Sequence, residues 1–375
     1  MNEHLVGDLS VIGLKGSEQF IAKVDAYLRE WRGEDSFIIT PDLVRFATGE
    51  GKCVLHQSVR GHDIYIIADV FNWGATYKMY GREVMMSPDE HFADLKRIIG
   101  AIMGKARRVT VIMPMIYEGR QDRRTLRESL DCSMMLKELV AMGVSNILTF
   151  DVHDSRVQNA IPNTGFDNIR TTYQMIKALL RNAKDIELDK DHLMVISPDE
   201  GGITRCMYLA TMLKVELGTF YKRRDYSVVV DGKNPIVEHK FLGSDVHGHD
   251  LVIVDDMIAS GQSVLEIADQ LKEMGARRIY VYTTFGLFTS GLAAFDEAYK
   301  KGHIDKVFTT NLIYRMPELA EREWYVEVDL TKYIALFIDT LNRDETISQL
   351  LDPADRINNF ICRWEEERRQ QKLIN

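Results

Sequence analysis

The sequence predicts an α/β protein of two domains, each with a mainly parallel sheet flanked by helices. Short apolar runs bounded by turn residues alternate with amphipathic segments at helical spacing. Several runs are apolar throughout, which is typical of parallel strands that are covered by helices on both faces. The length of 375 residues accommodates two domains, because one domain usually takes about 100 to 200 residues.

The individual elements follow from the apolar patterns. Strands are expected at 63–70, 109–115, 146–152, 193–197, 251–255 and 279–285. Helices are expected at about 17–32, 89–105, 129–142, 171–182, 203–213 and 263–274. Residues 331–351 and 354–371 each carry a further helical pattern. The second is so highly charged that a solvated surface helix is favoured over a partner-binding helix.

A short internal repeat bears on the domain organisation. ARRVTVIMPM at 106–115 and ARRIYVYTTF at 276–285 each follow a predicted helix with a glycine near its end. Such junctions recur in any α/β protein, so the repeat alone leaves open whether the chain is a duplication. If it is, the boundary falls near 165–172. We therefore expect an N-terminal domain at 1–168, a second domain at 169–335 and a C-terminal helical segment at 336–375.

Composition excludes several classes of function. The formal charge of −9 argues against a large nucleic-acid-binding surface, although local basic clusters could still bind small anions. The four cysteines form no CxxC pair, which fits reduced thiols in a cytosolic protein. The N-terminus has no signal-peptide pattern, and no apolar run approaches the about 20 residues that span a bilayer. A cytoplasmic protein without membrane contact is expected.

The stretch LVIVDDMIASGQSVLEIADQL, residues 251–271, places two carboxylates beside a run of small residues. Its loop follows a predicted strand and precedes a predicted helix. Parallel sheets bind ligands at this position, and the helix dipole favours an anion there. A sugar phosphate suits both halves of the loop, with hydroxyls on Asp255 and Asp256 and phosphate on the Ser-Gly residues. The alternative is a helix cap beside a charged loop.

Three further segments follow predicted strands. EGRQDRR at 118–124 offers guanidinium groups that match phosphate oxygens, although a solvated turn has the same composition. LTFDVHDSRVQ at 148–158 contains a histidine between two acids, either a metal ligand or an ordinary loop residue. SPDEGGITR at 197–205 is another strand-to-helix turn, with an acid and a glycine pair.

Taken in order, these segments resemble the ribose-phosphate diphosphokinases, also called phosphoribosyl diphosphate synthetases. The matching motifs are RFATGEG from Arg45, SVRGHD at 58–63, RQDR at 120–123, TFDVH at 149–153, SPDEGG at 197–202, YKRR at 221–224 and DDMIASGQS at 255–263. The resemblance covers about residues 8–350. It implies two type I phosphoribosyltransferase-like domains, with ATP and ribose 5-phosphate as substrates and Mg²⁺ as the metal.

The resemblance implies roles for the matching residues of the N-terminal half. Residues of two segments would hold ATP: Phe46, Thr48, Gly49, Glu50, Arg120 and Gln121. His153, together with Asp199 of the second half, would bind a Mg²⁺ ion that bridges the ATP phosphates.

In the second half, Lys222 and Arg224 would lie on a mobile catalytic loop and neutralise charge during the transfer. A KRR run is ordinarily a solvated patch. Asp255 and Asp256 would bind the ribose hydroxyls. The rest of the ribose 5-phosphate site would comprise Ala259, Ser260, Gly261, Gln262 and Ser263. In the implied reaction the C1 hydroxyl attacks the β-phosphorus of ATP and AMP leaves, so positioning and charge neutralisation are the main tasks.

The chain departs from the family pattern at several positions. Ala259 replaces the third acid of the sugar-phosphate motif, and Gln262 replaces a glycine. Thr48 replaces an aspartate of the ATP segment. Residues 71–88 replace a region that is built differently in common family members. That region and the C-terminal extension bear on assembly, for which the resemblance implies a homo-oligomer, either a dimer or a hexamer.

Three functions compete on the sequence. The first is a diphosphokinase that makes 5-phosphoribosyl 1-diphosphate. The second is a catalytically silent relative that regulates an active synthetase, which Ala259 and Thr48 favour and the retained catalytic and metal-binding motifs oppose. The third is a phosphoribosyltransferase, against which the RQDRR and KRR segments argue. No GxxxxGK[ST] motif occurs, which argues against a conventional P-loop kinase.

Overall fold

A computed structural model describes residues 5–183, 185–224 and 236–374, without the side chains of 222–239 and 372–374. The chain forms two compact units. Unit 1 comprises residues 1–171, 311–316 and 329–352, and unit 2 comprises residues 172–310, 317–328 and 353–375. The segment expected at 336–375 is thus divided between the two units.

Unit 1 contains a five-stranded, fully parallel sheet in the order β1-β4-β7-β8-β9. Its strands are β1 (Asp8–Gly13), β4 (His62–Ile67), β7 (Arg108–Ile112), β8 (Asn146–Phe150) and β9 (Gly165–Ile169). Residue 38 adds a parallel bridge to Val11 at the outer edge of β1. Two antiparallel hairpins stand apart from this sheet: β2 (Asp42–Arg45) with β3 (Gly51–Val54), and β5 (Thr76–Met79) with β6 (Arg82–Met85).

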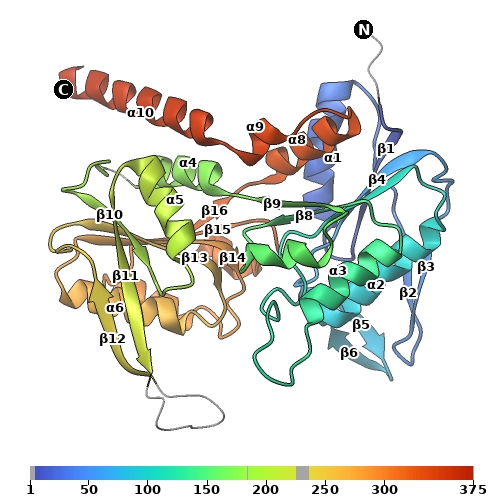
Figure 1. The fold of residues 1–375 in the computed structure, drawn as a ribbon, viewed down its shortest axis with the longest axis horizontal. Coiled ribbons are helices and arrows are strands. Elements are labelled where there is room, and N and C mark those ends of the chain that lie inside the picture. Colours follow the sequence, from blue (N-terminus) through green and yellow to red (C-terminus); the bar gives the residue numbers. More distant parts are fainter. Residues whose placement is uncertain (1–4, 184, 225–235, 375) are drawn as a thin grey trace. The chain divides into compact units, whose positions relative to one another are not determined.

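Helices cover both faces of the unit 1 sheet (Figure 1). They are α1 (Glu18–Arg32), α2 (Pro88–Ile102), α3 (Asp131–Ala141) and α8 (Thr331–Asn342), with a 3₁₀ turn η1 (Ser155–Ala160). Helix α1 packs against α8 on one face, while α2 and α3 cover the other. The core between sheet and helices is fully closed at Ile66, Val111 and Leu136. Helix α2 begins at a capping box of Ser87 and Glu90, which fixes the start of the helix.

Unit 2 contains a seven-stranded sheet in the order β12-β11-β10-β13-β14-β15-β16, parallel except for the β11–β12 pair. Its strands are β10 (Leu193–Ser197), β11 (Glu216–Arg224), β12 (Ile236–Leu242), β13 (Asp250–Ile258), β14 (Arg278–Gly286), β15 (Lys306–Thr310) and β16 (Tyr325–Val328). Its helices are α4 (Thr172–Asn182), α5 (Ile203–Leu213), α6 (Gln262–Glu273), α7 (Ala293–Lys300) and α10 (Ala354–Ile374), and η2 (Pro317–Glu321) is a 3₁₀ turn. A short helix of unit 1, α9 (Ser348–Leu351), precedes α10.

These observations confirm the predicted α/β class with mainly parallel sheets. Every strand expected from an apolar pattern is present, with bounds that shift by a few residues. The expected helices are present too, but the one expected at 331–351 is wrong as a single helix: it is divided into α8 and α9, because the chain turns at Asp344, which has φ +57°. Several strands were not expected, among them β1 and β11 as well as the shorter β9 and β16. In the part of the chain that the structure describes, no helix has the length and apolarity needed to cross a membrane.

The two units share a second internal repeat besides the one expected at 106–115 and 276–285. GHDIYIIAD at 61–69 runs into β4, and GHDLVIVDD at 248–256 runs into β13. Each segment accepts a hydrogen bond from the first arginine of the Arg-Arg pair that follows it along the chain. The peptide N–H of Arg107 donates to the carbonyl of His62, and that of Arg277 donates to the carbonyl of His249. The equivalent strands therefore hold equivalent neighbours, which supports an origin of the two units by duplication.

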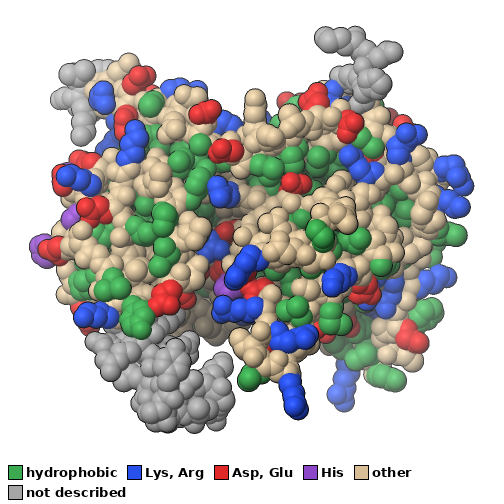
Figure 2. Space-filling model, in the orientation of Figure 1, with side chains coloured by type: hydrophobic (Ala, Val, Ile, Leu, Met, Phe, Trp, Pro, Cys, Tyr) green, Lys and Arg blue, Asp and Glu red, His purple; other side chains and the backbone are tan. Residues whose placement is uncertain are grey.

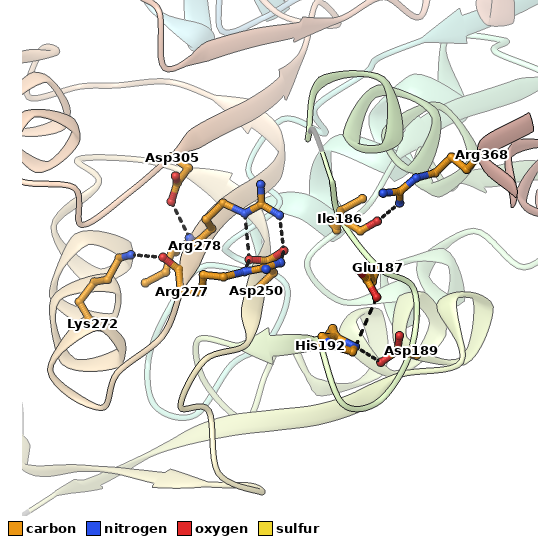
Figure 3. Close-up of polar contacts among 11 residues, drawn as sticks. Ile186, Glu187, Asp189, His192, Asp250, Lys272, Arg277, Arg278, Asp305 and Arg368 are labelled. Carbon is orange, nitrogen blue, oxygen red and sulfur yellow. Dashed lines mark hydrogen bonds and ion pairs between the residues drawn. The ribbon is translucent and has the colours of Figure 1, made fainter. Parts of the chain in front are cut away.

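A buried carboxylate opens each repeat. Asp63 accepts a bidentate pair of hydrogen bonds from Arg108, at 2.8 and 2.6 Å, together with one from the hydroxyl of Tyr65 and one from the side-chain amide of Asn342. Asp250 is fully buried and accepts bidentate pairs from both Arg277 and Arg278 (Figure 3).

Burial raises the pKa of Asp250, but the hydrogen bonds from the two guanidinium groups outweigh burial and leave this pKa below its ordinary value.

The Arg108→Met variant should lose thermal stability, because Asp63 then keeps its burial but loses its only guanidinium partner among the described residues. Removing one partner of a buried pair costs about 3–5 kcal/mol. In the matched Arg277→Met variant Asp250 keeps Arg278, so a loss nearer about 1 kcal/mol is expected. Scanning calorimetry of the two variants measures the difference, and equal losses would contradict it.

Candidate active site

The sheet of unit 2 has a topological switch point between β10 and β13. The chain leaves β10 through α5 toward β11 on one side, and it leaves β13 through α6 toward β14 on the other side. Because the two connections run apart, a crevice opens at the carboxyl ends of these adjacent strands, where α/β sheets bind ligands. The loops at 198–202 and 259–261 border this crevice.

Two neighbouring carboxylates lie at the carboxyl-terminal part of β13. Asp256 is buried, and its peptide N–H donates to Oδ1 of Asp255 at 2.9 Å. Burial, and next the negative charge of Asp256, raise the pKa of Asp255 above its ordinary value. The guanidinium of Arg205, on the first turn of α5, opposes this shift and lies 3.9 Å from Oδ2 of Asp256. The acid pair is thus held with one positive charge nearby.

The loop after the acid pair reaches the N-terminus of α6. Gly261 has φ +87°, and a Cβ atom there would lie 2.3 Å from the ring of Phe295, so only glycine fits this turn. Helix α6 begins at Gln262, which places the positive end of its dipole at the loop. The side chain of Gln262 donates to Glu266 at 2.8 Å and therefore lies along the helix. Both serines of the loop, Ser260 and Ser263, are exposed.

Asp199 follows β10 and turns the chain into α5. Its Oδ1 accepts the peptide N–H groups of Gly201 and Gly202, at 3.0 and 3.2 Å. The hydroxyl of Ser197 donates to the Asp199 carbonyl at 2.7 Å, which fixes the same turn from the other side. Asp199 and the acid pair therefore come from adjacent strands and lie at one edge of the unit 2 sheet.

Lys222 and Arg224 form the end of β11, where Lys222 pairs with His239 of β12. The resemblance placed these residues on a loop, and the structure places their backbone in the strand. Their side chains lie outside the described residues, as do residues 225–235, so the charge-neutralising role stays a prediction.

The ATP residues expected in unit 1 fall into two turns. Phe46, Thr48, Gly49 and Glu50 form the tight turn between β2 and β3, which we call the nucleotide turn (residues 46–50). The peptide N–H of Phe46 donates to the Glu50 carbonyl, and the N–H of Gly49 donates to the Phe46 carbonyl, both at 2.9 Å. The Thr48 hydroxyl donates to Glu50 at 2.9 Å, so Thr48 helps to close the turn. Half of the Phe46 side chain is exposed.

Arg120 and Gln121 lie in the exposed segment that follows β7. The peptide N–H of Gln121 donates to the carbonyl of Glu118 at 2.8 Å, and Glu118 has a φ of +54°. Burial, and next the charge of Asp131, raise the pKa of Glu118. No hydrogen bond among the described residues joins this segment to the nucleotide turn, so the expected ATP-binding role of the two segments together stays a prediction.

His153 is an exposed residue after β8, between Asp151 and Asp154. Hydrogen bonds from Arg156 lower the pKa of Asp154 to about 2. His153 belongs to unit 1 and Asp199 to unit 2, and each is described within its own unit. The expected pairing of the two as metal ligands stays a prediction.

One group of three described side chains has potential metal-ligand atoms within 4.8 Å of one another: Glu187, Asp189 and His192 (Figure 3). The Nδ1 atom of His192 lies 2.7 Å from Oδ1 of Asp189, and this hydrogen bond raises the pKa of His192. The group precedes β10, at the opposite end of the strand from Asp199, so it lies outside the candidate site.

Unit 1 has a closed counterpart of the sugar-phosphate loop. Asp69 and Gly74 correspond to Asp256 and Gly261 in the repeat. Tyr314 fills this loop: its peptide N–H donates to Asp69 at 2.6 Å, and its ring packs edge-on against Trp73. A Cβ atom on Gly74 would lie 2.4 Å from the same ring. Burial raises the pKa of Asp69 to about 7. Among the described residues, the unit 1 loop is thus filled by a side chain of its own unit, whereas Ser260 and Ser263 of the unit 2 loop are exposed.

Arg205 is the site residue that the sequence interpretation did not single out. It ends the segment SPDEGGITR, and no local pattern there shows that the course of α5 brings its side chain back to Asp256. Basic and acidic side chains are interspersed on the face drawn in Figure 2.

Comparison with known proteins follows the same division of the chain. A family model described as the N-terminal domain of ribose phosphate pyrophosphokinase matches residues 9–143. A model described as a phosphoribosyl transferase domain matches residues 165–317. The chain is 30% identical over 312 residues to ribose-phosphate pyrophosphokinases from Vibrio parahaemolyticus and Vibrio cholerae, with 82% of this chain and 90% of each relative covered.

The fold is similar to that of a solved protein. The crystal structure of phosphoribosylpyrophosphate synthetase from Mycobacterium smegmatis matches with a TM-score of 0.72 and 20% identity, covering 90% of this chain and 99% of that one. At this identity the match shows the fold alone. Together the comparisons confirm the resemblance drawn from the motif order and the type I phosphoribosyltransferase-like fold.

The raised pKa of Asp255 predicts a pH dependence of stability. A carboxylic acid whose pKa is higher in the folded than in the unfolded state keeps more protons when folded. The free energy of unfolding therefore falls as pH rises from about 4, the unfolded value, through the folded value. Asp255→Asn should remove this fall. Its melting temperature, relative to the parent protein, should rise between about pH 5 and about pH 8. A constant difference across that range would contradict the assignment.

Proposed function

The chain belongs to the ribose-phosphate pyrophosphokinase family of diphosphate-transferring enzymes, and from this we propose its reaction. It transfers the β,γ-diphosphate of Mg-ATP to the C1 hydroxyl of ribose 5-phosphate, giving 5-phosphoribosyl 1-diphosphate and AMP for nucleotide biosynthesis. Unit 1 supplies the residues for ATP, and unit 2 supplies those for ribose 5-phosphate.

The observation that carries the proposal is the loop after β13. It combines two carboxylates, which suit the ribose hydroxyls, with the N-terminus of α6, which suits the 5-phosphate. The left-handed backbone conformation of Gly261 fixes the course of this loop, because no residue with a Cβ atom fits beside Phe295. The ribose hydroxyls require hydrogen-bond acceptors, whereas the 5-phosphate requires donors and positive charge. The loop offers both within a few residues.

In the proposed reaction the C1 oxygen forms a bond to the β-phosphorus of ATP. The bond between the β-phosphorus and the oxygen bridging to the α-phosphorus breaks, and that oxygen leaves with AMP. The C1 hydroxyl loses its proton. Such transfers depend on in-line positioning and on neutralising negative charge. Asp255 and Asp256 orient the sugar, while Lys222 and Arg224 are assigned to the charge on the phosphates.

The donor set at this edge of unit 2 fits Mg²⁺, which prefers carboxylate and water oxygens. Asp199 is the residue that would hold the ion in unit 2, since two peptide N–H groups fix its carboxylate. His153 is the residue assigned to it in unit 1. When bound, Mg²⁺ would neutralise charge on the ATP phosphates.

The departures from the family pattern favour an altered site over a lost one. Gln262 lies along α6 on Glu266 and so leaves the loop backbone accessible. The carbonyl of Ala259 is fixed by the peptide N–H of Thr289 at 2.9 Å, which keeps the loop ordered without the missing acid. Ala259 still favours the second candidate, a catalytically silent relative that regulates an active synthetase.

The decisive experiment incubates the purified protein with Mg-ATP and ribose 5-phosphate and identifies the products by chromatography. AMP with a diphosphorylated sugar supports the proposal. ADP would indicate a simple kinase, and the absence of turnover would favour the silent relative. The molar mass of the protein in the same buffer tests the further expectation of a dimer or hexamer. Fractionation of cells tests the expected cytoplasmic location.

Lys222→Ala should reduce turnover by about two orders of magnitude or more, because one charge on the transferring phosphates is no longer neutralised. The melting temperature should change little. Lys190→Ala is the matched control, since Lys190 is an exposed lysine of the same unit at the opposite end of β10. Steady-state kinetics measure both variants, and full activity of Lys222→Ala would remove it from the catalytic machinery.

A further inference from the structure

The hairpin of β5 and β6 lies within residues 71–88, which the family resemblance does not explain. It packs against the nucleotide turn. The peptide N–H of Tyr80 donates to the Ala47 carbonyl at 2.8 Å. The side chain of Met79 packs closely against Gly49: a Cβ atom added to Gly49 would lie only 2.8 Å from the sulfur of Met79. The hairpin therefore supports the nucleotide turn directly.

Both hairpins are tied to α2, so their positions are fixed relative to each other. Arg45, at the end of β2, makes a bidentate ion pair with Asp94 at 2.6 and 2.7 Å. The ring of Tyr77 in β5 lies under the same guanidinium, at 5.3 Å, and its hydroxyl donates to Glu90. The tip of the β5–β6 hairpin is thus held beside the nucleotide turn from two sides.

Tyr80 occupies an unfavourable backbone position at this tip. It has φ +48° and is followed by Gly81 at φ +76°, as in a two-residue turn with both residues left-handed. Such turns prefer Asn-Gly, because a bulky side chain in the left-handed region clashes with its own backbone. A tyrosine here lowers stability relative to asparagine, and an observed outlier of this kind points to function.

Packing within the unit does not compensate for this conformation. The Tyr80 side chain is 76% exposed, and the Phe46 side chain on the adjacent turn is 51% exposed. Two aromatic rings therefore stand in solvent on neighbouring turns. Exposed aromatic rings are the usual platform for stacking the bases of nucleotides, and stacking tolerates any base because every base has a π-face.

We propose that Tyr80 is an additional nucleotide-binding residue, whose ring contacts the base of the ATP held at the nucleotide turn. This inference rests on the proposed function for the identity of the nucleotide. Tyr80 adds affinity for a purine or pyrimidine nucleoside triphosphate without distinguishing the bases. It lies outside the family's motifs, because the hairpin that carries it belongs to the region in which this chain differs.

Tyr80→Asn tests the inference without endangering the fold, since asparagine suits the left-handed turn better than tyrosine. We expect the KM for ATP to rise about tenfold, with kcat and the KM for ribose 5-phosphate unchanged and the melting temperature equal or higher. Tyr80→Phe keeps the ring and should keep the parent KM. Loss of binding in Tyr80→Phe as well would overturn a stacking contact.

Met103→Asn is the matched control. Met103 is also left-handed, with φ +57°, and 72% exposed, but it caps the C-terminal end of α2, and no hydrogen bond among the described residues joins it to the nucleotide turn. It should leave the KM for ATP unchanged. An unchanged KM in Tyr80→Asn would overturn the inference. A KM change accompanied by a change in molar mass would also overturn it, because the ring would then act through assembly.

Direct binding separates this inference from the proposed function. Calorimetric titration with ATP needs no turnover, so it applies even if no AMP is formed. The parent protein could make no AMP but bind ATP more tightly than Tyr80→Asn does. That result would contradict the proposed reaction and support the contact between Tyr80 and the base. If the parent protein binds no ATP, the contact is overturned too. If AMP forms equally well with both proteins at limiting ATP, the contact alone is overturned.

Discussion

The buried carboxylate at the start of β4 and of β13 is the constraint on which both sheets depend. A buried charge must be paired, so Asp63 and Asp250 each require arginines from the strand that follows along the sheet. In the register observed, Asp63 lies opposite Arg108 and Asp250 lies opposite Arg278. The ion pairs therefore join β4 to β7 and β13 to β14 at the ends of the strands that lie opposite the loops.

The two units share this arrangement of strands but differ in the loops that follow β4 and β13. In unit 2 the loop is open, since Gly261 turns sharply beside Phe295 and leaves the start of α6 facing outward. In unit 1 Tyr314 fills the equivalent position against Gly74. One scaffold thus carries a loop with exposed serines in one copy and a loop filled by Tyr314 in the other. In unit 1 the exposed aromatic side chains of Phe46 and Tyr80 instead lie on hairpins outside the sheet.

Sequence patterns predicted the central strands and the helices that flank them, including the strand, loop and helix that β13 and α6 form. The apolar run at 251–255 is buried on both faces, so its strand was evident locally. The β5–β6 hairpin was not expected, because its strands are only four residues long and mix polar with apolar residues, and its small apolar cluster of Ala75, Tyr77 and Met86 forms only once the chain is folded. The role of Arg205 was missed for the same reason, since no local pattern shows which way a helix turns a side chain.

The return of residues 311–316 and 329–352 to unit 1 has a consequence for biosynthesis. During translation, at about 5–20 residues per second, most of unit 2 is made before the last part of unit 1 exists. Until then Asp63 lacks the amide of Asn342, and Arg32 lacks Asp339. The nascent chain must therefore keep unit 1 incomplete while the sheet of unit 2 emerges. A shortened gene ending at residue 171 would encode a domain without its closing helix.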